Sequence, residues 1–195
     1  MASSISHSKS HDQKTLFGFW LYLMTDCMIF ATLFATYIVL QGQTNGHSGP
    51  KELFELDGVL LETLLLLASS FTAGMALIFS YKKNKNAILN WLLATALLGA
   101  GFLALEFKEF VHFFNEGNSW SASAFLSAFF TLVGTHGLHI SIGLLWLGIV
   151  AWQVYKHGVN SNIRRRLLMF TLFWHFLDLV WIFIFTIVYL VGVAI

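Results

Sequence analysis

Five long apolar stretches dominate this chain of 195 residues. An α-helix rises about 1.5 Å per residue, so about 20 apolar residues cross a hydrocarbon core of about 30 Å. Every stretch reaches that length. The sequence therefore predicts an all-α membrane protein with five transmembrane helices. These helices are expected at residues 16–40, 58–80, 87–107, 123–155 and 167–195.

The composition agrees with a protein that is mostly covered by lipid. Hydrophobic residues make up 57% of the chain and charged residues only 11%, whereas a soluble domain carries roughly 25% charged residues. The net charge of +1 and the lack of a basic patch exclude a nucleic-acid partner. The single cysteine, Cys27, excludes an internal disulfide and a metal cluster built from cysteines alone.

Lysine and arginine residues predict how the helices are oriented. Residues 1–15 are polar, lack the order of a secretory signal, and are expected to form a disordered cytoplasmic tail in front of a membrane domain over 16–195. This tail, the second loop and the fourth loop together hold nine Lys and Arg residues. The opposite side holds only Lys51 and Lys108. The positive-inside rule then places the N-terminus in the cytoplasm and the C-terminus in the periplasm.

Polar residues inside the predicted helices are the candidate functional residues. An acid at the bilayer centre costs about 2.5–3.5 kcal/mol on insertion scales, so it must be paired, protonated or functional. Asp26 lies about 15 Å deep in the first helix and is the main candidate for proton handling or lipid contact. Its alternative interpretation is a carboxyl group that is protonated by burial or paired with a histidine. The remaining polar positions, for which interhelical hydrogen bonding is expected, are Glu62, Glu106, His136, His139, His175 and Asp178.

The histidines also raise the question of haem or metal ligation. His136 and His139 are three residues apart on one helix face, which is too close for the two haems that a transmembrane helix can carry. Carboxylate-bridged metal sites need Glu-x-x-His pairs on two helices, and the sequence lacks them. The sequence therefore predicts no cofactor or metal site in this chain.

Glycine residues recur along the fourth apolar stretch. Small residues at such spacing let helices approach closely, which favours a central helix or one that packs against another protein. General glycine enrichment in membrane helices is the alternative. The glycines concerned are Gly134, Gly137, Gly143 and Gly148.

Several motifs resemble subunit III of the haem–copper oxidase superfamily. Thr-His-Gly-Leu-His occupies 135–139, and Trp-His-Phe-Leu-Asp-Leu-Val-Trp occupies 174–181. The segments 18–27 and 125–130 are similar to the bo-type (cytochrome o) ubiquinol oxidase form in particular. Five helices also match that bacterial form, because cytochrome c oxidase subunits III generally have two more at the N-terminus.

The resemblance implies a non-catalytic subunit in the bacterial inner membrane, within a proton-pumping oxidase that couples ubiquinol oxidation to oxygen reduction in aerobic respiration. Haems and copper are then expected in subunit I, with none in this chain, and the expected partners are subunits I, II and IV and phospholipids. The expected roles are assembly, lipid binding and sustained proton uptake by subunit I. Asp26 falls on the family's carbodiimide-reactive carboxylate, where many relatives have Glu. Other motif positions fall on Glu106, His136, His139, His175 and Asp178.

A second hypothesis comes from a different class of protein. Asp26, His139 and Asp178 are all expected near mid-membrane depth, where acids and imidazoles can pass protons. The same sequence would then encode a small proton-coupled transporter of the inner membrane.

Overall fold

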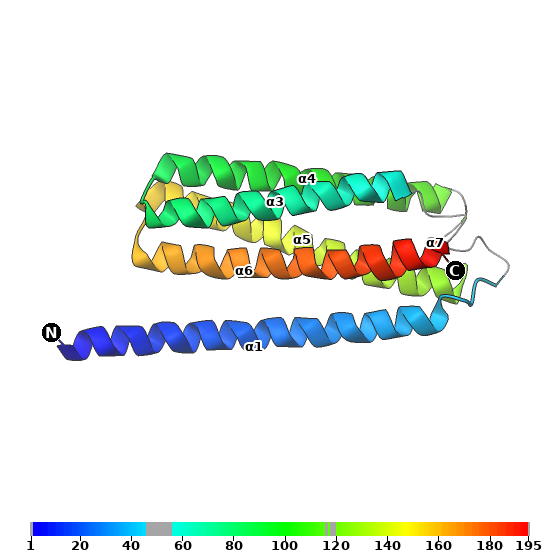
Figure 1. Ribbon diagram of the computed structural model, residues 1–195, viewed down its shortest axis with the longest axis horizontal. Helices are drawn as coiled ribbons and strands as arrows, with labels where there is room; N and C mark the ends of the chain where they lie inside the picture. The colour runs from blue at the N-terminus through cyan, green and yellow to red at the C-terminus, as the bar shows by residue number, and fades with distance from the viewer. Residues whose placement is uncertain (1, 46–55, 116, 118–119, 195) are drawn as a thin grey trace.

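The computed structural model describes residues 2–45, 56–115, 117 and 120–194, and its regular elements in these ranges are all helical (Figure 1). Five helices in the described part of the chain are long and apolar enough to cross a membrane. The predicted all-α fold with five spans is therefore confirmed. The elements are α1 (Ala2–Leu40), α3 (Leu56–Tyr81), α4 (Lys85–Asn115), α5 (Ala124–His157), α6 (Ser161–Ile184), the π-helix η1 (Phe185–Leu190) and α7 (Val191–Ala194).

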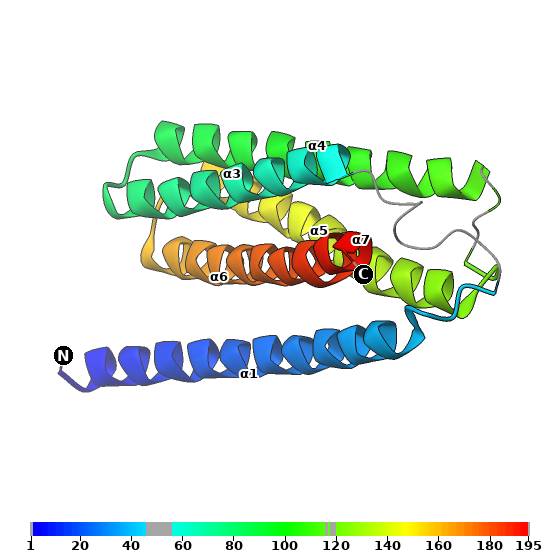
Figure 2. The same cartoon turned by 45° about the vertical axis from the view of Figure 1, so that its right-hand side comes forward.

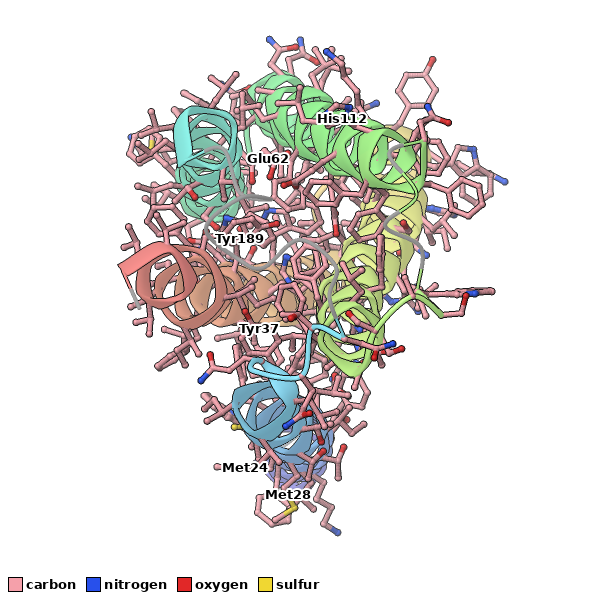
Figure 3. The ribbon with its side chains drawn as sticks, turned by 90° about the vertical axis from the view of Figure 1, so that its right-hand side faces the viewer. Met24, Met28, Tyr37, Glu62, His112 and Tyr189 are labelled. Carbon is pink, nitrogen blue, oxygen red and sulfur yellow. The ribbon has the colours of Figure 1, made fainter. Side chains whose placement is uncertain are left out.

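Four of the helices form a ring, and the fifth packs outside it. α3 contacts α4 and α6, and α5 contacts the same two helices from the other side, so the ring closes. α1 contacts only one side of the ring, against α5 and α6 (Figures 1 and 2). Figure 3 looks along the bundle and shows side chains filling the ring, with α1 set apart below it.

Trp174 of α6 contacts the other three helices of the four-helix ring from its interior. Its side chain is fully buried, and its indole N–H donates a hydrogen bond to Ser69 Oγ of α3 at 3.0 Å. A Cβ atom at Gly99 of α4 would lie 2.8 Å from the indole ring, and a Cβ atom at Gly143 of α5 would also lie 2.8 Å from it. Only glycine at these two positions leaves room for the indole, so Gly99 and Gly143 form a slot that the indole fills. One indole thus contacts three neighbouring helices.

Two helix ends differ from the sequence prediction at the start of the chain and after the third span. The structure continues α1 back to Ala2, where a disordered tail was expected over residues 1–15. No glycine or proline precedes Gly18, so nothing in that segment interrupts the helical backbone. α4 continues to Asn115 and not to residue 107, because no glycine or proline lies between residue 107 and Gly117, which has φ +83°. The cytoplasmic location of the first residues stays a prediction.

The last span begins earlier than predicted and ends in an unusual turn. α6 starts at Ser161 and not at residue 167, because the Asn160 side chain caps it by accepting a hydrogen bond from the Ile163 N–H at 3.0 Å. The basic run 164–166 therefore lies within a helix. After Ile184 the backbone widens into the π-helix η1, a rare form that is frequent at functional sites.

Candidate functional site

Asp26 and His139 meet where α1 packs against α5. Asp26 is only 4% exposed, and its Oδ1 lies 3.9 Å from His139 Nε2. His139 Nδ1 donates a hydrogen bond to the Thr135 carbonyl oxygen at 2.7 Å, since a carbonyl can only accept. Because Nδ1 carries the proton that makes this hydrogen bond, Nε2 bears a proton only when the imidazole is cationic. The unprotonated face of the neutral imidazole is thus the one that lies toward the Asp26 carboxyl group.

The surroundings of this pair limit what else can stabilise its charge. The phenol of Tyr22, one turn earlier on α1, lies beside the Asp26 carboxyl group. Asp26 Oδ2 has no hydrogen-bond partner among the described residues. The ring of Phe30 lies 5.2 Å from that of His139 and closes one side. His139 and Tyr22 are therefore the polar side chains that the structure places beside the Asp26 carboxyl group.

His136 lies in an aromatic cluster and does not join that pair. Its ring stacks on Trp181 at 5.2 Å and meets the edge of Phe102 at 5.9 Å. The residue is fully buried, and neither ring nitrogen has a hydrogen-bond partner within the described ranges. The hydrogen bonding that the sequence led us to expect is thus not seen for His136.

His175 and Asp178 lie at the contact between α6 and α3. Asp178 is 8% exposed and lies beside Ser70 of α3. A Cβ atom at Gly74 would lie 3.9 Å from His175 Nε2, and His175 itself is exposed. In the described part of the chain, no hydrogen bond or ion pair joins these two residues to Asp26 and His139. The intramembrane polar residues therefore form separate groups on different helix contacts.

Three carboxyl groups gather near the end of the ring where α3 begins. Glu62 of α3 and Glu106 of α4 are 4% and 3% exposed, and they interact electrostatically with each other and with Glu109. The phenol of Tyr189 in η1 donates a hydrogen bond to Glu109 Oε2 at 3.2 Å. Figure 3 shows Glu62 and Tyr189 inside the ring of helices. Glu62 and Glu106 are therefore buried between the helices of the ring.

Sequence reasoning missed the polar anchors that hold the buried aromatic residues. Trp181 donates a hydrogen bond to Thr63 Oγ1 at 3.1 Å, across 118 residues of sequence. Tyr189 is 80 residues away from Glu109, its partner. Serine and threonine in apolar helices carry no individual signal for such bonds. Within the described residues, no group of three or more His, Cys, Asp or Glu side chains could hold a metal ion.

Known proteins resemble this chain over nearly its whole length. The family model described as "Cytochrome c oxidase subunit III" matches residues 3–193. "Cytochrome bo(3) ubiquinol oxidase subunit 3" of Pseudomonas putida is 52% identical over 94% of this chain and 89% of the relative. "Quinol oxidase subunit 3" of Bacillus subtilis (strain 168) is 46% identical over 92% and 88% of the two chains. "Cytochrome c oxidase subunit 3" of Bacillus sp. (strain PS3) is 45% identical over 91% and 86%.

Proposed function

The chain belongs to the cytochrome c oxidase subunit III family, and we propose that it is the non-catalytic third subunit of a proton-pumping ubiquinol oxidase. The observation that carries this proposal is the 52% identity to a bo(3) ubiquinol oxidase subunit 3 over 94% of the chain. Five apolar spans and bacterial relatives make it a multi-pass protein of the bacterial inner membrane. In this proposal haems and copper belong to subunit I, and subunits I, II and IV and phospholipids are the partners.

The transporter hypothesis is not favoured. Its relay required Asp26, His139 and Asp178 to act in sequence. Asp26 and His139 do lie together, but Asp178 packs against α3 beside Ser70. The curated relatives quoted above are all named as oxidase subunits.

We further propose that Asp26 supports proton uptake by the neighbouring catalytic subunit. Asp26 and His139 place a buried carboxyl group and an imidazole 3.9 Å apart at a helix contact, and such an acid–imidazole pair can store or relay a proton. Asp26→Asn keeps the size of the side chain and replaces the carboxyl group with an amide that cannot ionise. The purified complex with Asp26→Asn is expected to oxidise ubiquinol at nearly the wild-type initial rate but to inactivate several times sooner. Turnover is followed as oxygen consumption until activity stops.

Two reference complexes make this experiment decisive. A complex that lacks the chain gives the full effect of losing it, and it should keep its initial activity if the catalytic centre lies in another subunit. Cys27→Ser, one residue further along α1 and exposed, is the matched control and should behave as wild type. An unchanged lifetime in Asp26→Asn would leave Asp26 a packing residue. A chain-free complex with full haem and copper content but no initial activity would overturn the non-catalytic role.

The proposed orientation puts the turn between α3 and α4 in the cytoplasm. Nine of the eleven Lys and Arg residues lie on that side. In a Cys27→Ser background, Lys83→Cys should react with a membrane-impermeant maleimide in inverted vesicles and not in spheroplasts. Trp120→Cys, 73% exposed on the opposite side, should show the reverse. Labelling of Lys83→Cys in spheroplasts would contradict the orientation.

A further inference from the structure

Unpaired polar atoms are concentrated in one part of the ring interior. Among the described residues, eight buried side-chain atoms lack a hydrogen-bond partner, and five of them belong to three residues: one to Glu62 and two each to Glu106 and His136. All three residues are buried. A buried polar group without a partner costs free energy, so a native protein normally pairs it with another protein group or with an ordered water molecule.

Trp181 of α6 shows that Glu62 and His136 lie in the same part of the ring. Its ring stacks on that of His136 of α5 and lies 6.3 Å from that of Tyr189 in η1. Its N–H donates a hydrogen bond to Thr63, the neighbour of Glu62 on α3. These side chains therefore gather around one indole, and Figure 3 shows Glu62 and Tyr189 in the interior of the ring.

The helix α4 brings two more acids to this place. The Glu106 carboxyl group lies over Gly137, the neighbour of His136, where a Cβ atom would be 2.8 Å and 2.9 Å from its two oxygens. Glu106 interacts electrostatically with Glu62 and Glu109. The phenol of Tyr189 donates its hydrogen bond to Glu109. We call these groups the inner polar site, which consists of Glu62, Glu106, Glu109, His136 and Tyr189.

The charges within the inner polar site limit how many of its acids can ionise. The charged groups that act on Glu106 are Glu62 and Glu109, and the one that acts on Glu62 is Glu109. Like charges in an apolar interior repel strongly, so neighbouring carboxyl groups there keep a proton. The hydrogen bond from Tyr189 favours a negative charge on Glu109. Glu62 and Glu106 are then the acids that stay protonated.

Protonated acids and a neutral imidazole need a partner that both donates and accepts hydrogen bonds. A protonated carboxyl group offers one O–H donor and keeps acceptor capacity, and a neutral imidazole offers one donor and one acceptor. Water meets both needs, and buried water molecules typically bind groups that lack another partner. A metal ion would use the acceptors but would leave the donors unpaired.

Space for water lies next to Glu106. A groove of about 280 Å³ between α4 and α5 is lined in part by Glu106, Gly134, Gly137 and Ser141. One water molecule takes up about 30 Å³ in the liquid, so the groove has room for several. The two glycines leave space because they have no side chain, and Ser141 adds a hydroxyl group. The groove is therefore polar where it meets the Glu106 carboxyl group.

We propose that the inner polar site binds a small cluster of water molecules, which bridges Glu62, Glu106 and His136 while both acids stay protonated. The ligands of the site are thus water and protons. The site is separate from the contact between α1 and α5 that holds Asp26 and His139. The inference goes beyond the proposed function and does not depend on a role for Asp26.

The first test locates water in the purified oxidase complex. X-ray radiolysis turns bound water into hydroxyl radicals, and mass spectrometry identifies the side chains that these radicals oxidise. We expect oxidation of His136 and Tyr189, although both are fully buried. Trp174 is the internal control, because it is equally buried and its N–H is paired with Ser69, so it should stay unmodified. Oxidation of Trp174 to the same extent, or none of His136 and Tyr189, would overturn the proposal.

The second test asks whether the acids carry protons. A protonated carboxyl group has a C=O stretching band in the infrared that neither a carboxylate nor an amide has. At neutral pH, the complexes with Glu62→Gln and with Glu106→Gln should each lose part of this band relative to the wild type. The part that is lost should shift in heavy water, because bound water exchanges its protons. Glu109→Gln is the matched control and should leave the band intact.

The variants also separate a protonated acid from an ionised one. Glutamine resembles a protonated glutamic acid in size and hydrogen bonding, so both Gln variants should stay in the complex on heating as the wild type does. Glu106→Leu has no polar group and should reduce the oxidation of His136 several-fold. An unchanged infrared band in both Gln variants, or loss of the chain from both complexes, would show that the acids are ionised and would overturn the proposal. The subunit role would survive as long as the wild-type chain purifies with the haem-bearing complex.

Discussion

Trp174→Ala is expected to destabilise the four-helix ring more than any other single truncation in this chain. The indole is fully buried, fills the slot between Gly99 and Gly143, and donates its N–H to Ser69. Removing it leaves a large cavity among the four helices, and Ser69 keeps only its hydrogen bond to the Leu66 carbonyl oxygen. Loss of a buried tryptophan costs about 3 kcal/mol or more. The variant subunit should therefore dissociate from the heated complex at a temperature several degrees lower than the wild type.

Trp152→Ala is the matched control for this prediction. Trp152 is 59% exposed on α5, so its loss removes the same side chain from the surface and leaves no cavity. The measurement is the fraction of chain that remains with the haem-bearing subunits after stepwise heating. Equal dissociation temperatures for Trp174→Ala and Trp152→Ala would show that the indole does not hold the ring together.

Gly143→Val tests the same slot by filling it. The first added carbon would lie 2.8 Å from the Trp174 ring and 3.3 Å from Phe173, and neither ring can turn away in a packed interior. Overpacking of this kind typically costs 1–3 kcal/mol. The variant should accumulate in membranes at a reduced level and should dissociate from the complex at a lower temperature than the wild type.

The same helix supplies the control for Gly143→Val. Gly148 has no atom within 4 Å of the position that a Cβ would take, so Gly148→Val should be tolerated. In a Trp174→Phe background, where the ring is smaller, Gly143→Ala should cost less than it does beside the tryptophan. If Gly143→Val and Gly148→Val have equal effects, the close approach at Gly143 does not matter for stability.

The spans were predictable because length and apolar composition in a membrane protein leave few alternatives. The helix ends were less predictable, because they depend on local capping rather than on hydropathy. The Asn160 side chain starts α6 six residues earlier than the apolar stretch suggests. α4 runs past Lys108 because that polar segment contains no breaker before Gly117. The π-helix η1 has no sequence signal that we recognise.

The individual polar residues of the candidate sites were predictable, but which of them lie together was predictable only in part. Asp26 was expected to be paired with a histidine or functional, and it lies beside His139. Asp178 was expected at the same mid-membrane depth as Asp26 and His139. Depth alone, however, does not say which way a side chain points around its helix. Tyr189 could not be connected to Glu109 from sequence, because the contact depends on how η1 turns toward α4.

We propose that this chain is a haem-free subunit of a terminal ubiquinol oxidase. The most direct measurement is the mass of the intact complex after mild detergent extraction, followed by release of single subunits and determination of haem in each. The chain should appear once in a complex with larger haem- and copper-bearing subunits and should be released as a 22.0 kDa species with no haem. A chain that purifies alone, or that is released with haem bound, would contradict this account.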